Sequence, residues 1–579
     1  MLARMRLLRE TLVVGLAIAA LLLATPSVTA QVPGGNAPSD KLSPEVREQL
    51  ESVGPQVLVP VIVQFEAEPD AAQFARVTSG GGSVKARFGA LHGYAARVPA
   101  ARIEAMAAAQ GVERISYDVP VSAHLNVAVD AVEGDLAFKN SGGLDGKGVG
   151  IAVIDTGVVA HPDLVRPSGT PQIVEVEIVG TERGLADYFG HGTHVIGILN
   201  GNGAASSDSL SYRTFRGLSP GARIISVRAL YPDGTGYTSD IMMGLDWAIR
   251  NKAAYNIRVV NLSLGHPIYE SFRTDPLCRM VRAAHDAGIV VVVAAGNDGD
   301  VGGGFGTITS PANEPSAITV GAMNDKGTAS IADDERAWFS AKGPTLIDYV
   351  AKPDLVAPGV GLISARAPGS WLDTNFHSLV LKIGEYKNDT KNATKDGAYV
   401  RLSGTSMAAP LVSAAAAQMI QKDPTLNPAT VKARLMKYAQ KDGCLVFETG
   451  AGFLNVDRAL QASERASLAM SPFVRPADDG GVYLQDTAIL WGADWKVDGV
   501  WGADKGLASG VSLKDVPPEI VQTYGAIWGG GKAGKLSLVD NTQVSTTGAI
   551  WGGGRSNLTH TASVVDILGA IWGGGKRGP

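Results

Sequence analysis

The sequence has little cysteine and little net charge, and both shortages exclude classes of protein. Cys278 and Cys444 are its two cysteines, too few for a disulfide-dense scaffold or a CxxC zinc site. They either form one disulfide, if the protein is exported, or remain two unpaired thiols, and the sequence leaves both alternatives open. Lys and Arg total 51 against 56 Asp and Glu, so the chain lacks the basic surface that nucleic-acid binding requires.

Long hydrophobic runs are also scarce, and the longest lies at the N-terminus. Three arginines precede an apolar run from Leu12 to Ala24, and the small or modest side chains of Val28-Thr29-Ala30 follow. The run is shorter than the roughly 20 residues that a membrane-spanning helix requires. The pattern is typical of a secretory signal peptide. We therefore expect residues 1–30 to be removed after Ala30, which predicts a secreted, extracellular protein without a stable membrane span.

The next two segments differ sharply in composition. Residues 31–56 are rich in Pro, Gly, Ser and charge and predict a linker. Residues 57–124 begin with the β-branched run Val57 to Phe65 and continue in a β-α-β-β-α-β pattern, which predicts a small α+β, ferredoxin-like domain. A unit of this size and simplicity is not expected to hold an active site of its own.

Residues 125–468 have the pattern of an α/β domain. Apolar strands at 149–154, 222–230, 258–264 and 289–295 alternate with helices at 241–252 and 276–287. Strands that read as continuous apolar runs are buried on both faces, and helices between them indicate right-handed crossovers. The expected fold is a doubly wound, mostly parallel sheet, in which ligands bind beyond the carboxyl ends of the strands.

Three short motifs lie at such strand ends or helix starts. Asp155-Thr156-Gly157 follows a buried strand, Gly190-His191-Gly192-Thr193-His194 begins a helix, and Gly404-Thr405-Ser406-Met407-Ala408-Ala409-Pro410 enters an Ala-rich helix. Each alone is most simply a turn or a helix cap. Together they supply what serine-dependent peptide hydrolysis requires: a hydroxyl nucleophile, an imidazole base, and an acid that orients the imidazole.

With these motifs, in the order Asp, His, Ser, the chain resembles the subtilisin family of serine proteases across roughly residues 57–462. The resemblance implies Asp155, His191 and Ser406 as the catalytic triad. It also implies that Asn297, in Ala294-Ala295-Gly296-Asn297, joins the backbone N–H of Ser406 as an oxyanion donor. The chemistry itself would need no cofactor.

The same resemblance implies how substrate binds. Gly234-Thr235-Gly236 and Ser263-Leu264-Gly265 match the two segments between which family members hold an extended peptide as an added strand. Ala295 and Gly296, which precede Asn297, belong to the same substrate-binding set. The residues that follow Asn297 match too poorly to predict the preferred side chain at the cleavage site.

A structural calcium ion is a weaker expectation. His161-Pro162-Asp163 matches a family segment whose aspartate ligates calcium, but residues 200–211, which would complete the site, do not match clearly. Calcium requires six to eight oxygen ligands, so Asp163 alone is only a candidate.

The small domain of residues 57–124 resembles the inhibitory propeptide of the family. As such it would be a folding template and a product-like inhibitor of its own enzyme. Self-cleavage is expected between Pro120 and Asp130.

Residues 469–579 form a Gly/Trp-rich C-terminal extension. Residues 480–579 hold 21 of the 71 glycines and six of the nine tryptophans. The heptapeptide Gly-Ala-Ile-Trp-Gly-Gly-Gly begins at Gly525, Gly548 and Gly569, and looser copies lie at 489–492 and 500–502. Such repeats either present aromatic rings to a glycan or to the cell envelope, or dock on the catalytic domain or on one another.

Two functions are therefore compatible with the sequence. The first is a secreted serine endopeptidase made as a self-processed zymogen. The second is a surface-binding protein that presents its Trp/Gly repeats on an inactive protease fold. The intact set of Asp155, His191, Ser406 and Asn297 favours the enzyme.

Overall fold

The computed structural model describes residues 38–118, 120–123, 132–165, 173–180, 184–299, 305–328, 333–441, 445–476, 482–485, 487–496 and 500–501. The expected signal peptide, Cys444 and the three Gly-Ala-Ile-Trp-Gly-Gly-Gly copies lie outside these residues. Most of the interval in which we expect self-cleavage, residues 124–130, also lies outside them.

The N-terminal unit has the predicted β-α-β-β-α-β order. Its elements are β1 (Leu58–Phe65), α3 (Ala71–Ser79), β2 (Ser83–Phe88), β3 (Gly93–Pro99), α4 (Ala100–Ala107) and β4 (Val112–Tyr117). The strands form an antiparallel sheet in the order β2-β3-β1-β4. Alternate residues of β1 face opposite sides: Val61 and Val63 pack with α4, whereas Ile62 packs on the large domain. Both faces of this small sheet are thus buried.

Part of the expected linker is folded. Residues 44–52 form α2 (Pro44–Ser52), which begins at Ser43, whose hydroxyl accepts a hydrogen bond from the backbone N–H of Val46. Val46 is fully buried against the N-terminal sheet, and Leu42 bridges to Ile115 of β4. The linker prediction is therefore wrong for this stretch, because its few apolar residues complete the core of the N-terminal unit.

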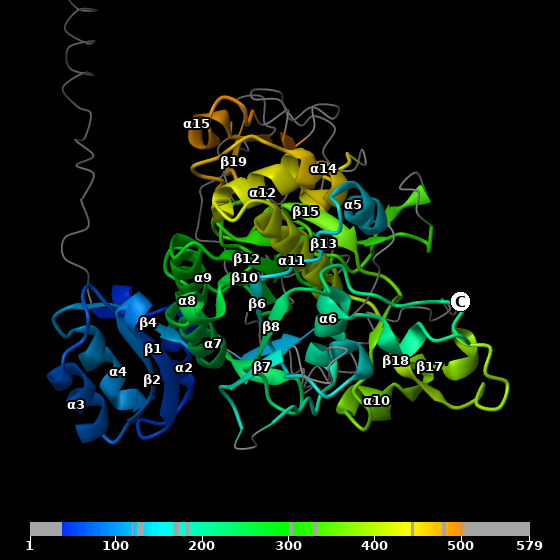
Figure 1. The fold of residues 1–579 in the computed structure, drawn as a ribbon. Coiled ribbons are helices and arrows are strands. Elements are labelled where there is room, and N and C mark those ends of the chain that lie inside the picture. Colours follow the sequence, from blue (N-terminus) through cyan, green and yellow to red (C-terminus); the bar gives the residue numbers. More distant parts are fainter. Residues whose placement is uncertain are drawn as a thin grey trace, which may run out of the picture.

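The large domain is built on an eight-stranded sheet (Figure 1). In chain order the strands are β6 (Gly150–Asp155), β7 (Ile173–Glu177), β8 (Arg223–Arg228), β10 (Ile257–Leu262), β12 (Val290–Ala294), β13 (Ile318–Asn324), β14 (Glu335–Arg336) and β15 (Leu355–Pro358). Neighbours run β14-β13-β12-β10-β6-β8-β7, with β15 also paired to β13, and every pair is parallel except β13 with β14. The predicted doubly wound, mostly parallel sheet is confirmed.

Helices cover both faces of this sheet. In β12, Val290 and Val292 pack in one core with α6 (His191–Asn200) and α11 (Thr405–Lys422), whereas Val291 and Val293 pack in a second core with α7 (Thr238–Arg250) and α9 (Pro276–Asp286). Strands buried on both faces need apolar side chains at every position, which explains the unbroken valine run. The N-terminal unit covers the outer side of α7 and α9 (Figure 1).

The beginning of the C-terminal extension packs on the large domain. It contains β19 (Val474–Pro476), β20 (Val482–Leu484) and α15 (Ala488–Trp491). Trp491, Trp495 and Trp501 are at most 3% exposed and pack with Ala429, Ala433 and Met436 of α12 (Pro428–Lys437). The tryptophan of each looser copy, Trp491 or Trp501, thus packs on the domain that precedes it.

Two further sequence questions can be addressed within the described residues. Cys278 is a free, buried thiol on α9. Of the helices that the structure describes, none combines the length and the apolar character that a membrane span demands.

Candidate active site

Asp155 and His191 meet at the carboxyl end of the sheet. Asp155 is the last residue of β6, and His191 is the first residue of α6. The Nδ1 atom of His191 lies 2.6 Å from Oδ1 of Asp155, and both side chains are at most 1% exposed. Oδ1 also accepts a hydrogen bond from the backbone N–H of Thr156. A carboxylate at Nδ1 holds the proton on that nitrogen and leaves Nε2 as the basic atom of the ring.

Ser406 lies in the first turn of α11, directly after Gly404 and Thr405. Its hydroxyl donates to the carbonyl oxygen of Ser263 at 3.1 Å, and the hydroxyl of Ser263 donates to the carbonyl oxygen of Ser406 at 2.6 Å. These reciprocal bonds hold the start of α11 against the segment that follows β10. The nucleophile candidate therefore lies beside one of the two predicted substrate-binding segments.

The Asn297 side chain is oriented by its oxygen. Oδ1 accepts hydrogen bonds from the backbone N–H and the hydroxyl of Thr405, both at 2.9 Å. A backbone N–H only donates, so the amide oxygen must face Thr405 and the NH2 group must point away from it. Nδ2 is buried and has no hydrogen-bond partner among the residues that the structure describes. An unpartnered, fixed donor beside Ser406 has the geometry that an oxyanion would use.

The two predicted substrate-binding segments hold a strand between them. β5 (Pro120–Ala123) pairs antiparallel with β9 (Thr235–Tyr237) on one side and with β11 (Leu264–Gly265) on the other. Ser122 lies opposite Thr235 and Gly265, and Ala123 lies opposite Leu264. The N-terminal unit thus inserts its own chain in the cleft, in the way that an extended substrate would be added.

Close approach explains two of the glycines in these segments. A Cβ atom on Gly234, whose φ is +81°, would lie 2.6 Å from the ring of Phe189. A Cβ atom on Gly265 would lie 2.6 Å from the hydroxyl oxygen of Thr309. Neither distance is compatible with a side chain, so the backbone of each segment can approach its neighbours only as glycine. Ala295 and Gly296 are close to the same elements. The Ala295 carbonyl accepts a hydrogen bond from the Thr309 hydroxyl at 3.2 Å, and the N–H of Gly296 donates to the Thr405 hydroxyl at 3.2 Å.

Asp187 is a buried carboxylate that the sequence motifs did not reveal. It lies four residues before His191, is 4% exposed, and accepts hydrogen bonds from the hydroxyl of Thr156 and the backbone N–H groups of Gly190 and Thr193. Burial raises the pKa of Asp187. The residue ties the start of α6 to the end of β6 and so fixes the Asp155–His191 pair. Its sequence signal was an acid one turn before a helix start.

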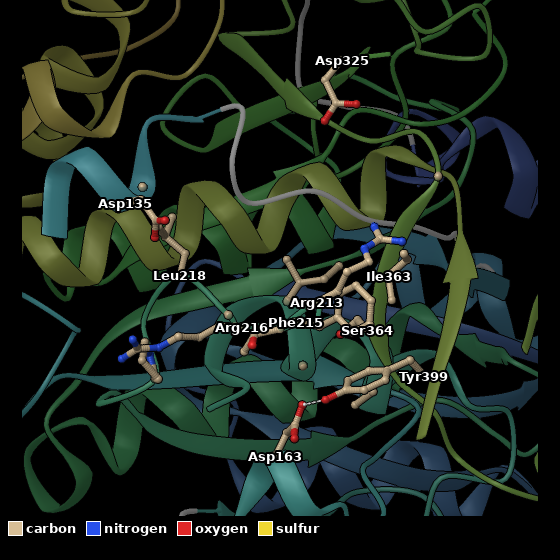
Figure 2. A pocket seen from close by; sticks show the side chains of 18 of the residues that line it. Asp135, Asp163, Arg213, Phe215, Arg216, Leu218, Asp325, Ile363, Ser364 and Tyr399 are labelled. Carbon is tan, nitrogen blue, oxygen red and sulfur yellow. Dashed lines mark hydrogen bonds between the residues drawn. The ribbon is translucent and has the colours of Figure 1, made fainter. Parts of the chain in front are cut away.

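Asp163 does not have the surroundings of a calcium ligand. Its Oδ1 accepts a hydrogen bond from the backbone N–H of Ala205 at 2.7 Å, and its Oδ2 accepts one from the hydroxyl of Tyr399 at 2.8 Å (Figure 2). Both oxygens thus face hydrogen-bond donors where calcium needs converging oxygen ligands. The described residues contain no cluster of three or more His, Cys, Asp or Glu side chains that would hold a metal. The Asp163 prediction is therefore not supported by this geometry.

Asp163 and Tyr399 line a cavity of about 630 Å³ that is separate from the triad (Figure 2). Its walls combine apolar side chains such as Phe215 and Ile363 with Arg213 and Arg216. Asp155, His191 and Ser406 are not among the residues that line it.

Comparisons with known proteins agree with this architecture. The sequence model of the subtilase family matches residues 146–453. Serine protease AprX of Bacillus subtilis is 35% identical over 391 residues, which cover 65% of this chain and 81% of AprX. Subtilisin Savinase of Lederbergia lenta is 33% identical over 317 residues, which cover 55% of this chain and 92% of that protein.

A solved structure shares the fold. Fervidolysin from Fervidobacterium pennivorans, described as a keratinolytic enzyme related to subtilisin, superposes with a TM-score of 0.52 at 22% identity. The superposition covers 71% of this chain and 62% of fervidolysin. Since the family match spans more than half of the chain, and since AprX is matched along most of its length, this protein belongs to the subtilase family and is a serine endopeptidase.

Proposed function

We propose that the protein is a secreted endopeptidase that hydrolyses peptide bonds with the triad Asp155, His191 and Ser406. The observation that carries the proposal is β5, an extended segment paired on both edges next to Ser406. A cleft that binds backbone on both sides accepts many sequences, which suits an enzyme acting on protein chains.

The chemistry follows from the atoms of the site. The Ser406 hydroxyl attacks the substrate carbonyl carbon while Nε2 of His191 takes its proton, and Asp155 stabilises the resulting imidazolium. The oxyanion accepts hydrogen bonds from Nδ2 of Asn297 and the backbone N–H of Ser406. His191 then returns the proton to the leaving amine as the C–N bond breaks. Water then attacks the acyl-enzyme while Nε2 of His191 takes its proton, and His191 returns the proton to the Ser406 oxygen as the acyl group leaves.

Residues 57–124 act, in this proposal, as an inhibitory propeptide. Several contacts support it besides β5. The Asp118 carboxylate accepts a hydrogen bond from the backbone N–H of Ser239 at 2.6 Å, in the first turn of α7. Arg114 donates to Glu270 at 2.6 Å, and Lys85 lies 2.8 Å from Asp240. The unit therefore blocks the cleft and neutralises charge at the start of α7 at the same time.

Self-cleavage would follow β5. Ala123 lies opposite Leu264, and the carbonyl of the preceding residue, Ser263, contacts the Ser406 hydroxyl. A chain bound in this register presents its next bonds to the nucleophile. We therefore place the cut after Ala123 and before Asp130.

The full chain carrying Ser406→Ala tests the triad and the processing together. We expect it to accumulate as the uncut precursor, whereas wild type should yield a mature fragment whose N-terminus lies within residues 124–130. Ser413→Ala is the matched control, because Ser413 lies on the same helix and bonds to Asn261 rather than to the cleft. Normal maturation of purified Ser406→Ala would contradict self-processing.

The alternative is a surface-binding protein on an inactive protease fold, and active-site labelling separates it from the enzyme. A fluorophosphonate should modify Ser406 in the mature protein and should fail to modify it in His191→Ala. An unlabelled wild type with its cleft open would favour the alternative. Binding of the Trp/Gly extension to isolated cell envelope or glycan would then be the relevant assay.

Export is proposed on the N-terminal pattern of arginines, apolar run and small residues. The exported precursor should begin at Gln31 when the Ser406→Ala chain is recovered from outside the cytoplasm and sequenced. A precursor that retains Met1 in that fraction would contradict a cleaved signal.

A further inference from the structure

The first residues of the C-terminal extension are bound into the large domain. Residues 471–474, which we call the junction segment, lead into β19 beside α12 (Figure 1). The backbone N–H of Ala351 donates to the carbonyl of Pro472 at 2.8 Å, and that of Val474 donates to the carbonyl of Tyr349 at 2.8 Å. The junction segment therefore pairs antiparallel with this stretch of the large domain, like an added strand.

The stretch that it pairs with has a strained backbone. Ile347 and Tyr349 have φ angles of +66° and +54°, in the left-handed region that residues with a side chain rarely adopt. Such a conformation persists only where surrounding contacts hold it. The junction segment supplies one of these contacts directly, at the Tyr349 carbonyl. Asp348 lies between the two strained residues, so the direction of its carboxylate depends on the same contacts.

Asp348 holds the loop that precedes α9. Its carboxylate accepts hydrogen bonds from the Ser271 hydroxyl at 2.6 Å and the backbone N–H of Phe272 at 2.8 Å. It also accepts one from the Arg273 guanidinium at 3.0 Å. Phe272 is 8% exposed and packs on Phe473 of the junction segment, with ring centroids 6.3 Å apart. The junction segment thus fixes this loop twice, through Asp348 and through Phe473.

The same loop contacts the N-terminal unit on both sides of Phe272. Glu270 accepts a hydrogen bond from Arg114 of β4 at 2.6 Å, and the carbonyl of Thr274 accepts one from Nε2 of Gln64 in β1 at 3.0 Å. Gln64 and Glu270 are at most 8% exposed. A displaced loop would leave these buried polar groups without partners, which costs more than the loss of an exposed hydrogen bond.

We propose that the junction segment is a positioning element of the surface that binds the N-terminal unit, and that it sets the affinity of the mature enzyme for this unit. The inference rests on the proposed inhibitory role of the N-terminal unit. It also divides the extension in two. Residues 471–501 pack on the large domain and support inhibitor binding, whereas this role does not need the three Gly-Ala-Ile-Trp-Gly-Gly-Gly heptapeptides.

The processed complex of the full chain tests the proposal. The complex is diluted in steps, and fluorophosphonate labelling of Ser406 reports the fraction of clefts from which the N-terminal unit has dissociated. Phe473→Ala should raise the dissociation constant of the unit by about tenfold, within the range of coupling that packed side chains transmit between sites. The kcat of the released enzyme on a short peptide should change far less than this constant.

Asp348→Asn is a second, isosteric variant, which keeps the test open if Phe473→Ala does not fold. Its NH2 group cannot accept a hydrogen bond, so it loses one of the contacts with the loop and should raise the dissociation constant as well.

A double-mutant cycle shows whether the effect passes through the loop. In Arg114→Ala the bond to Glu270 is already lost, so the addition of Phe473→Ala should weaken the complex by a smaller factor than it does in wild type. A chain that ends at Gly502 is the matched control. It keeps the junction segment and the docked tryptophans but lacks the heptapeptides, and it should bind the unit as wild type does.

An unchanged dissociation constant in both Phe473→Ala and Asp348→Asn would overturn the proposal. Equal factors for Phe473→Ala in the wild-type and Arg114→Ala chains would overturn it too, since the effect would then bypass the loop. A weakened complex in the chain that ends at Gly502 would refute the division of the extension. Failure of the proposed function looks different, because wild type would then form no processed complex or would be labelled equally at every dilution.

Discussion

Replacement of Asn297 separates the catalytic from the structural role of one side chain. Asn297→Ala removes the buried Nδ2 donor, which no described residue accepts from, and also the oxygen that accepts from Thr405. Loss of one oxyanion donor in a subtilisin lowers kcat by about 10²- to 10³-fold, and we expect a fall of the same order in this member of the family. KM should hardly change, because the donor acts on charge that develops only in the transition state.

The structural cost can be worked out from the same contacts. Two hydrogen bonds to Thr405 are lost, at a net of about 0.5–1.5 kcal/mol each, so Asn297→Ala should lower the free energy of unfolding by about 1–3 kcal/mol. Asn297→Asp keeps an oxygen for Thr405 but lacks the donor, so it should lose less stability and at least as much kcat.

Autoprocessing of the full chain is the assay for these variants, because it is a single turnover that needs no mature enzyme. Its rate should fall by the same factor as kcat, while thermal unfolding reports the stability term separately. Wild-type processing rates in both variants would refute the oxyanion assignment. A rate that falls only in proportion to the folded fraction would refute it equally.

Three further predictions concern the surroundings of the site. Because the Tyr399 hydroxyl donates to the buried Asp163 carboxylate, Tyr399→Phe should cost about 1–3 kcal/mol in unfolding experiments by stranding a buried carboxylate oxygen. Burial raises the pKa of Glu270 from 4.5 to about 7 while the N-terminal unit covers it. At a pH between about 4.5 and 7, binding of that unit is therefore accompanied by uptake of a proton by the Glu270 carboxylate. Inhibition of mature enzyme by the separate unit should therefore tighten as the pH falls from about 7 to 5, with a smaller slope in Glu270→Gln; weaker inhibition on acidification would contradict the linkage. Burial, together with Asp275 and Glu314, raises the pKa of the Cys278 thiol, so maleimide should label Cys278 only after denaturation.

The parts of the fold that could be predicted from the sequence are those whose cause is local. The apolar run of β12 reflects burial on both faces. The motifs around Asp155, His191 and Ser406 each combine a reactive side chain with the small residues that the adjoining turn requires. The helix α2 also had a local signal, Ser43 followed by Pro44, which is typical of a helix start. Composition alone suggested a linker there, whereas the helix-capping pair Ser43-Pro44 correctly indicates a helix.

Strand β2 has a weak signal for a related reason. Its sequence Ser-Val-Lys-Ala-Arg-Phe alternates apolar residues with charged ones, and only Phe88 is fully buried. Its Lys85 lies 2.8 Å from Asp240 of the large domain, so a position that reads as an exposed charge in fact makes a contact between the two units.

Other features depend on partners far away in the sequence. Asp187 reads as an ordinary turn acid until Thr156 and the start of α6 converge on its two oxygens. Trp371 has no local signal of its role until its ring stacks on that of Phe189, which lies far away in the sequence. In both cases the residue acquires its role from a contact that no local periodicity encodes.

The tryptophans of the extension show where local sequence stops being informative. Trp491 and Trp501 follow the same apolar-Trp-Gly pattern as the later heptapeptides, and both are buried because α12 presents alanines and Met436 to them. The indole of Trp491 also donates to the carbonyl of Met470 at 2.8 Å, which satisfies its one polar atom. Whether a Trp-Gly unit docks or is displayed is thus decided by the surface that meets it, since the unit itself is compatible with both.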